Sequence, residues 1–488
     1  MKRIILLGLL LAVISLTACQ STNENSTTDA VSTDSEVELV EYSSISEESK
    51  ESKESEESKE SEESDVIDLS GIEEPERPYQ EEMPPLEPRP MLEQPSIPLE
   101  DSSLPRIDIE FDDAKYELDK EDYESADVTI TNAGEYNLDT SAAGIRIRGN
   151  TTSDVDKRPL RIKFDKKVSL FGRDKEKSWT LLSNIFDKTL IHNYIAYDLY
   201  DYLTPEGTFT SLCVFVDVYV NGGYQGVYTL CDQISTGSGR IDINSKLGDT
   251  PEETDYLVEQ DFRAYFEGDE NGKQGIGWFW MKRVNECFIV KSPETSELKT
   301  TKYTDYIKQY MDEAYEVILQ QDWAKIQEYI DVDSFIDGFM AAEIVKSQDI
   351  GQCSVYYYKK ENGKLTFAVL WDCDLTFGSG DRYKPDDEVL SQNNIFFGYL
   401  MQVPEFRKLY VDTFNSVYED ALNHILTEIE DVTTQYHDEL ENDYIHWESK
   451  FDWCSDEMKA LESYDAQIEY MKNWITTRMN WLHKTYNE

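Results

Sequence analysis

The sequence predicts an α+β fold for residues 105–488, in which a strand-rich first part is followed by a helix-rich second part. Up to Pro293, apolar residues fall in short alternating runs rich in β-branched side chains, which is typical of strands. Beyond Pro293 they recur every three or four residues, as on one face of a helix. Aromatic residues make up 12% of the chain, so the material for a buried core is ample.

The strand-rich part also contains one helix and a tight hairpin. The predicted strands are 107–111, 127–131, 144–149, 160–164, 179–182, 255–260 and 287–291. A helix is predicted over 189–203, because its apolar residues follow the helical spacing. The hairpin spans 213–230 and turns at Asn221-Gly222, a pair that readily adopts the backbone of a tight turn.

The helix-rich part shows four amphipathic stretches and one further hairpin. The predicted helices are 301–320, 332–346, 405–426 and 455–484. Between the second and third helices, strands at 354–360 and 364–370 flank a turn at Asn362-Gly363.

The extreme N-terminus resembles a lipoprotein signal peptide over residues 1–18. Two basic residues precede an apolar run at 4–14, which is shorter than the about 20 residues needed to span a bilayer. The run ends in Leu16-Thr17-Ala18-Cys19, which looks like a bacterial lipobox. We therefore expect lipidation of Cys19 and a mature extracytoplasmic lipoprotein, anchored in the bacterial membrane.

Residues 19–104 predict a disordered stalk between the anchor and the folded domain. The first half is a low-complexity Ser/Glu/Lys repeat without an apolar face, and the second half is rich in proline. Repulsion between like charges and extended proline segments make such a chain a spacer.

The overall charge argues against nucleic-acid binding. The chain has 99 acidic and 46 basic residues and a formal net charge of −53. Because nucleic-acid affinity depends largely on basic residues that neutralise phosphates, we expect no nucleic-acid partner.

Basic side chains line one face of two predicted strands. Arg146 and Arg148 lie two residues apart, as do Arg161 and Lys163, so each pair shares a strand face. These four side chains either pair with surrounding carboxylates or form an anion site, for which phosphate is the common biological ligand.

The densest chemical signal is acidic and follows the second hairpin. Asp372 and Asp374 end an apolar strand with i, i+2 spacing, so a continuing strand would project both carboxylates to one side. In the hairpin register, paired residue numbers add up to about 724, which places Asp349 opposite about residue 375. Three clustered carboxylates repel one another unless a cation lies between them, and oxygen ligands favour Mg²⁺ or Mn²⁺. The sequence therefore predicts a divalent metal site.

An anion site beside such a metal site is what nucleoside triphosphate chemistry requires. The sequence contains no P-loop, no H-R-D motif and no G-x-G-x-x-G motif, so an ordinary kinase or P-loop enzyme is excluded by motif.

Six cysteines remain besides Cys19, and none forms a C-x-x-C pair, which argues against a structural zinc site. Cys213 and Cys231 lie at similar distances from the turn of the first hairpin. They either form a disulfide across the strands or remain buried free thiols.

Several ordered segments resemble the CotH kinase family, over about residues 140–380 with a looser helical continuation. The matching segments, each numbered at its first residue, are Arg148-Gly-Asn-Thr-Thr, Arg158-Pro-Leu-Arg-Ile-Lys-Phe, Ser178-Trp-Thr-Leu-Leu, Asp187-Lys-Thr-Leu-Ile-His-Asn, Val218-Tyr-Val-Asn-Gly-Gly-Tyr-Gln-Gly-Val-Tyr, Tyr256-Leu-Val-Glu, Phe288-Ile-Val-Lys, Asp333-Ser-Phe-Ile-Asp and Leu370-Trp-Asp-Cys-Asp-Leu-Thr-Phe-Gly. The resemblance implies an atypical, strongly diverged protein-kinase-like fold. It also implies an enzyme that uses ATP with Mg²⁺ or Mn²⁺ to phosphorylate Ser/Thr on itself and on spore coat or surface proteins.

The resemblance also implies roles for individual residues. Asp349 matches the catalytic aspartate, Asp372 the metal-binding aspartate, and Asp374 is expected to join it at the metal. Lys163 would contact the phosphates, assisted by Arg148 and Arg161. Tyr228 and Trp371 are candidates for walls of the nucleotide-binding pocket.

Three positions depart from the family pattern. Ser347 stands where an Asn usually precedes the catalytic aspartate by two residues, Cys373 replaces an aromatic residue, and the acid after the first hairpin lies in Cys231-Asp232-Gln233. These departures keep an alternative open: a catalytically inactive kinase-fold protein that acts in binding or adhesion at the cell surface. If the enzyme is active, its own Ser-rich stalk is a candidate substrate.

Overall fold

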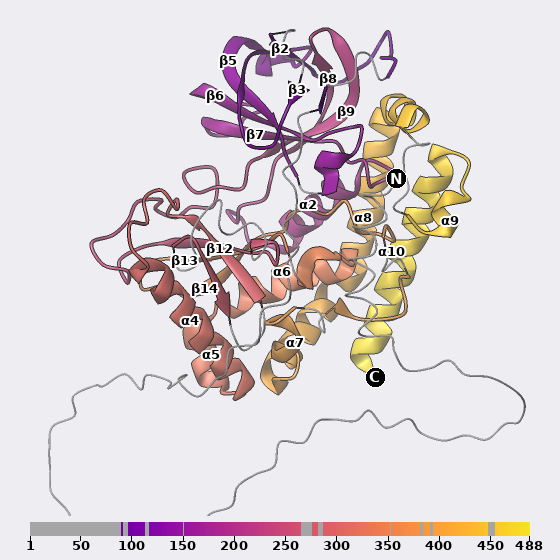
Figure 1. Ribbon diagram of the computed structural model, residues 1–488. Coiled ribbons are helices and arrows are strands. Elements are labelled where there is room, and N and C mark those ends of the chain that lie inside the picture. The colour runs from indigo at the N-terminus through magenta and orange to yellow at the C-terminus, as the bar shows by residue number, and fades with distance from the viewer. Residues whose placement is uncertain are drawn as a thin grey trace, which may run out of the picture. The chain divides into compact units, whose positions relative to one another are not determined.

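The computed structural model describes residues 89–90, 96–112, 117–149, 151–264, 276–281, 286–351, 353–380, 384–390, 394–447 and 454–488 (Figure 1). The predicted signal peptide, Cys19 and nearly all of the predicted stalk lie outside the described residues, so those interpretations stay predictions. The described part mixes strands and helices in the predicted order and confirms the α+β class.

Seven strands form a closed barrel. In order around the barrel they are β2 (Arg106–Phe111), β4 (Glu124–Thr131), β5 (Leu138–Ile147), β6 (Leu160–Val168), β7 (Glu176–Leu182), β9 (Gly223–Asp232) and β8 (Cys213–Val220). Neighbouring strands are antiparallel except β2 and β8, whose parallel pairing closes the barrel. Alternate residues fill its interior, for example Ile145 and Ile147 of β5, while Arg146 between them points outward.

A second, five-stranded sheet has the order β11–β12–β10–β13–β14. Its strands are β11 (Trp278–Met281), β12 (Glu286–Ser292), β10 (Tyr256–Gln260), β13 (Val355–Lys359) and β14 (Leu365–Val369). Helices α4 (Lys302–Leu319) and α6 (Val332–Val345) pack against this sheet, and the short α5 (Trp323–Tyr329) connects them (Figure 1).

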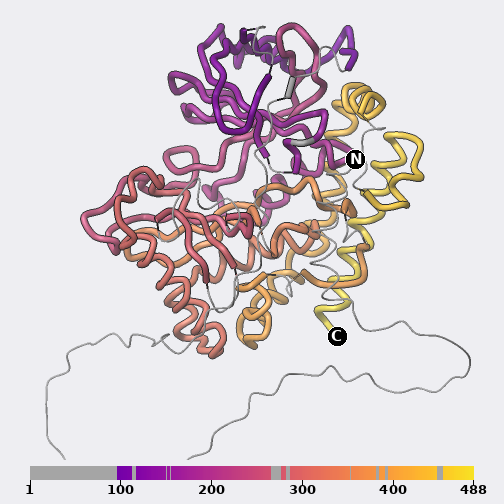
Figure 2. Tube along the Cα trace, in the orientation of Figure 1, coloured from indigo at the N-terminus to yellow at the C-terminus, as the bar shows by residue number. Residues whose placement is uncertain are grey.

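The C-terminal helices form the rest of the larger core. They are α7 (Phe397–Leu400), α8 (Pro404–Trp447), α9 (Asp456–Lys459) and α10 (Tyr464–Asn487). The trace in Figure 2 shows α8 and α10 running side by side, in agreement with their packing contacts. Helix α8 is much longer than the predicted 405–426 and is interrupted at Tyr436, and the predicted helix 455–484 is split into α9 and α10.

The packed structure begins before residue 105, where composition predicts the end of the stalk. Leu104 is buried, and the amide and hydroxyl of Ser103 both donate to Glu439 of α8 at 2.7 Å. Ser102 donates to Asp217 of β8 at 2.6 Å. Residues 96–104 therefore line the folded part although their composition matches that of the linker.

Cys213 and Cys231 lie directly opposite each other on β8 and β9, as the hairpin predicts. Both are free thiols in this structure, which agrees with the second of the two alternatives. Burial raises the pKa of Cys213, and a hydrogen bond to Cys231 adds to that effect.

None of the helices in the described part of the chain combines the length and the apolar character that crossing a bilayer requires.

Candidate functional site

The second hairpin brings the acidic segments together as its register predicts. Tyr357 pairs with Phe367 and Lys359 with Leu365, so paired residue numbers add up to the expected value. Beyond the ladder, the amide of Gln348 donates to the carbonyl of Leu375 at 3.4 Å. Asp349, at the start of a short 3₁₀ helix (Asp349–Gly351), therefore lies beside the segment that carries Asp372 and Asp374.

The strand does not continue through the two aspartates, so this premise of the sequence analysis is wrong. β14 ends at Val369, and Asp372 has a left-handed backbone with a φ of 63°. Its carboxylate accepts a hydrogen bond of 3.0 Å from Ser354, and its amide donates to the Tyr197 hydroxyl at 3.3 Å. Such a backbone is unfavourable for a residue with a side chain, and these two contacts stabilise it.

Helix α2 (His192–Leu203) holds the segment 371–374, called the aspartate loop from here on, in place. Asn193 accepts a hydrogen bond from the Cys373 amide at 2.8 Å, and Nδ1 of His192 lies 3.2 Å from the Asp374 carbonyl oxygen. The ring of Tyr197 stacks on Trp371 with centroids 5.7 Å apart. Residues from the first two turns of α2 therefore contact Trp371, Cys373 and Asp374.

A buried polar network ties the start of α2 to the barrel. Asp187 accepts hydrogen bonds from the amide of His192, the first residue of α2, and from the Thr189 amide, both at 2.7 Å. Asn184 accepts from Asn193 at 3.0 Å and donates to Thr229 of β9 at 2.7 Å. The position of the aspartate loop is thus coupled to the barrel through amide side chains.

The three carboxylates are close enough to affect one another's ionisation. Burial raises the pKa of Asp349 to about 7, and the charge of Asp372 adds to this effect. The pKa of Asp374 is raised well above its usual value by burial and then by Asp372 and Asp349. Their oxygens do not all lie within 4.8 Å of one another. A cation would relieve this repulsion, and carboxylate oxygens are the ligands that a hard divalent ion prefers.

The outward-facing arginines form a positive cluster next to this loop. Arg146 and Arg161 are cross-strand partners on β5 and β6, and Arg148 lies 5.6 Å above the ring of Trp371. The charge of Arg148 lowers the pKa of Asp374, which brings the basic and acidic groups into one site. Burial lowers the pKa of Arg161, and the charges of Arg146 and Arg148 lower it further.

Arg161 has no carboxylate partner among the described residues, and its buried Nε has no hydrogen-bond partner. Arg146 donates to the carbonyl oxygens of Lys120 and Glu121 at 2.6 and 3.1 Å. An unpaired, half-buried guanidinium that is repelled by its neighbours favours an anion nearby. The phosphates of a nucleotide fit this requirement.

Lys163 follows Arg161 by two residues on β6 and shares its strand face. It pairs with Gly144 across the strands, is exposed, and has its Nζ 5.6 Å above the ring of Tyr123. Within the described residues, no interaction joins Lys163 to Asp349, Asp372 or Asp374, so its contact with phosphates stays a prediction.

Of the two aromatic candidates, only Trp371 lies at the site. Together with Asp349 and Ser354 it lines a small cavity. Tyr228 is 1% exposed inside the barrel and donates to the carbonyl oxygen of Arg158 at 3.0 Å. Its side chain is part of the barrel core, and its predicted role at the nucleotide stays untested.

The structure adds charged residues to which the sequence analysis assigned no role. Arg263 forms a bidentate pair with Asp261 at 2.8 and 3.0 Å, and its charge lowers the pKa of Asp349. Glu259 pairs with Lys291 at 2.8 Å and accepts from the Tyr356 hydroxyl at 2.6 Å. Glu259 and Lys291 are the last residues of two segments that carry the family resemblance. Their place in those segments is the sequence signal that could have identified them.

The fold and the site define a class: an α+β protein in which a barrel that carries arginines lies beside a buried aspartate loop. The family model described as CotH kinase protein matches residues 145–482, and the chain belongs to this family. The match runs from β5 into α10 and confirms the resemblance seen in the sequence. No curated protein matches the sequence.

Proposed function

We propose that the protein is an atypical, ATP- and divalent-metal-dependent Ser/Thr protein kinase with a diverged kinase-like fold, displayed outside the bacterial cell through Cys19. The observation that supports this proposal best is that an acidic cluster and a basic cluster, each without enough counter-charge of its own, lie in one site. Three mutually repelling carboxylates, Asp349, Asp372 and Asp374, lie near the arginine cluster. Within that cluster, Arg161 has no carboxylate partner in the described part of the chain. Mg²⁺- or Mn²⁺-bound ATP would complete both.

Each residue of the site would have a role that follows from its position. Asp372 and Asp374 would hold the metal ion, which supplies neutralisation of the phosphate charge when bound. Arg148 and Arg161 would bind and orient the phosphates, and Trp371 would form one wall of the nucleotide-binding pocket. Asp349 would accept the proton of the substrate hydroxyl at its carboxylate, and a pKa of about 7 suits that task near neutral pH.

One observation favours a second candidate, a kinase-fold surface protein that binds without turnover. Ser347 replaces the Asn that usually precedes the catalytic aspartate, and its side chain is buried beside the cavity that Asp349 lines. A hydroxyl has a shorter reach than an amide, so Ser347 would weaken metal binding or change which group orients the substrate.

Transfer of γ-labelled phosphate by the full-length protein, with Mn²⁺ or Mg²⁺, separates the two candidates. We expect labelling of the protein itself and loss of at least about 100-fold in the Asp372→Ala variant, because one metal ligand is removed. Asp242→Ala is the matched control, since the Asp242 side chain is 92% exposed and only a 3.8 Å ion pair with Lys360 is lost.

Equal labelling by wild type and Asp372→Ala would contradict the proposed site, and binding of ATP without any labelling would favour the second candidate. Mass spectrometry of the labelled protein would locate the acceptors. If the stalk is the substrate in cis, phosphopeptides should map to the Ser/Glu repeat at 43–64.

A further inference from the structure

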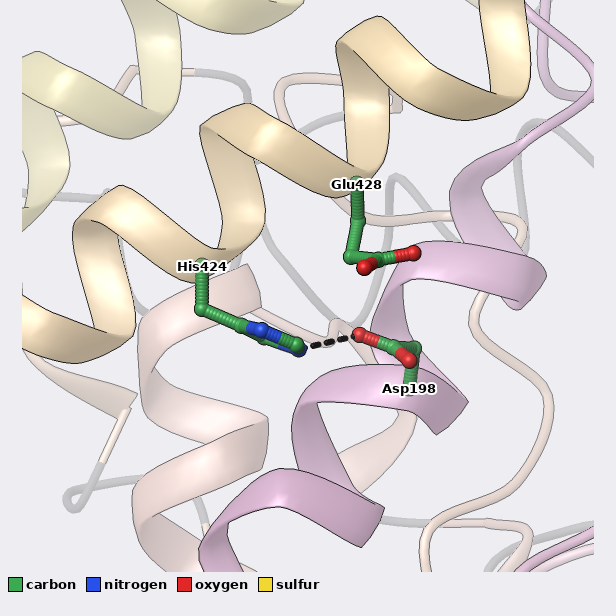
Figure 3. Close-up of side chains that lie close together, drawn as sticks. All are labelled: Asp198, His424 and Glu428. Carbon is green, nitrogen blue, oxygen red and sulfur yellow. Dashed lines mark hydrogen bonds and ion pairs between the residues drawn. The ribbon is translucent and has the colours of Figure 1, made fainter. Parts of the chain in front are cut away.

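A second group of potential metal ligands lies away from the aspartate loop, between α2 and α8. It consists of Asp198 on α2 with His424 and Glu428 on α8 (Figure 3). One donor atom from each residue lies within 4.8 Å of the other two. Among the described residues, this is the group of His, Cys, Asp and Glu side chains that meets this criterion.

The three side chains converge because of helix geometry. His424 and Glu428 are four residues apart, so both lie on one face of α8. Asp198 approaches from α2, and Figure 3 shows its carboxylate directed at the imidazole with the Glu428 carboxylate above it. Nε2 of His424 lies 2.5 Å from Oδ2 of Asp198.

The charges of the group do not balance. Two carboxylates face one imidazole, and no other cation in the described part of the chain forms an ion pair with either of them. Even with a protonated imidazole the group keeps a net negative charge, which a divalent cation would reverse.

The surroundings orient the ligands and leave room for solvent. The ring of Tyr202 stacks on the His424 imidazole with centroids 4.2 Å apart and an interplanar angle of 15°. The side chains of His424 and Asp198 are 24% and 30% exposed, so an ion can enter from solvent. Two ligands of one tetrahedral Zn²⁺ lie about 3.3 Å apart, so the imidazole and Asp198 would separate by less than about 1 Å.

We propose that Asp198, His424 and Glu428 bind a divalent transition-metal ion, with Zn²⁺ as the best match. One imidazole nitrogen and two carboxylate oxygens form a borderline donor set, whereas Mg²⁺ and Ca²⁺ prefer sites made of oxygen alone. Three protein ligands leave one position for water. The site is separate from the Mg²⁺ or Mn²⁺ proposed at Asp372 and does not depend on kinase activity.

The ion would connect α2 to α8 at a functionally relevant place. Tyr197, the neighbour of Asp198, contacts the Asp372 amide and stacks on Trp371. A metal bridge at Asp198 would therefore stabilise the helix that positions the aspartate loop, and it would do so without contacting ATP or the protein substrate.

The test measures Zn²⁺ binding to the full-length protein by calorimetry and by metal content after dialysis. To remove Zn²⁺ binding at the aspartate loop, wild type and variants are compared in an Asp372→Asn background. We expect about one Zn²⁺ per chain, an increase in melting temperature on Zn²⁺ addition, and an at least about 100-fold weaker affinity in His424→Gln.

Glu428→Gln tests the same site without breaking the His424–Asp198 pair, so its effect on Zn²⁺ affinity does not depend on that ion pair. His437→Gln is the matched control: His437 also lies on α8 and pairs with Asp465 at 2.8 Å, and its loss should leave Zn²⁺ binding unchanged.

Unchanged Zn²⁺ affinity in both His424→Gln and Glu428→Gln would overturn the proposal. The same holds if wild type binds no Zn²⁺ at micromolar concentrations while His424→Gln lowers stability, because the three residues would then serve only as an ion pair between helices. Failure of phosphate transfer in any variant bears on the kinase proposal and not on this one.

Discussion

At the scale of single residues, Arg161 distinguishes the site from an ordinary charged surface. Arg106, for comparison, is paired with Asp108 on the same barrel strand. Arg161 instead lies among Arg146, Arg148 and two tyrosines. A guanidinium in such surroundings destabilises the protein unless a ligand compensates it.

We therefore expect Arg161→Gln to weaken binding of Mn²⁺–ATP about 10- to 100-fold, the range for a lost charge-assisted hydrogen bond to phosphate. Titration of ATP into the full-length protein measures the dissociation constant whether or not phosphate is transferred. Arg106→Gln is the control and should bind ATP like the wild type. Similar dissociation constants for the two variants would show that Arg161 does not contact the nucleotide.

At the scale of elements, α6 shows how one helix can carry both favourable and unfavourable acids. Asp331 caps its N-terminus by accepting from the Ser334 amide at 3.3 Å, and Asp333 lies in the first turn, where the helix dipole favours negative charge. Asp337 lies one turn further on and is half-buried. Burial and then the charges of Asp333 and Asp331 raise its pKa from 3.8 to about 7.

This shift predicts a pH-dependent cost in stability. Because the folded state favours protonated Asp337, its stabilising contribution is complete below about pH 4 and is lost as the pH rises to about 7. Asp337→Asn should thus raise the free energy of unfolding at pH 8 by about 1–2 kcal/mol, after discounting for partial exposure, and change it little near pH 4.

Urea unfolding of the full-length protein at pH 4.5 and pH 8 measures the difference. Asp333→Asn should give a smaller gain, since Asp333 acts on Asp337 only through its charge. A gain from Asp337→Asn that is the same at both pH values would refute the assignment.

At the scale of the whole folded part, a buried ion pair joins the barrel to the C-terminal helices. Asp443 of α8 accepts from Lys157 at 2.6 Å and from the Val227 amide of β9 at 2.7 Å, and both charged side chains are fully buried. Gly226 has a φ of +111°, and a Cβ there would lie 2.3 Å from the Asp443 carboxylate. Glycine is required here by backbone conformation and by this close approach.

Loss of this link should lower the stability of the whole folded part. Asp443→Asn leaves Lys157 as a buried charge without its counter-ion, so we expect the free energy of unfolding to fall by about 3–5 kcal/mol. Asp438→Asn, on the same helix with a side chain 87% exposed, should change it by less than about 1 kcal/mol. Chemical denaturation compares the two, and equal effects would show that the buried pair does not carry the connection.

The hairpin residues show how much of the site local pattern predicts. The turn at Asn362-Gly363 and the alternation of its strands determine the register, and the register alone placed Asp349 near residue 375. The outward direction of Arg146 and Arg161 likewise follows from the two-residue period of strands. These features depend on residues close together in the chain, so the sequence predicts them.

Other features depend on residues far apart in the chain. Parallel pairing of β2 with β8 closes the barrel and places Tyr228 inside it, and contacts with α2 hold Asp372 in a left-handed backbone that strand periodicity does not predict. The group formed by Asp198, His424 and Glu428 exists only because α2 packs on α8. The sequence by itself determined the α+β order, the hairpin registers and the family. Only the tertiary structure decided which side chains from distant elements come into contact. Such contacts arise from the packing of whole elements, and no local periodicity in the sequence predicts them.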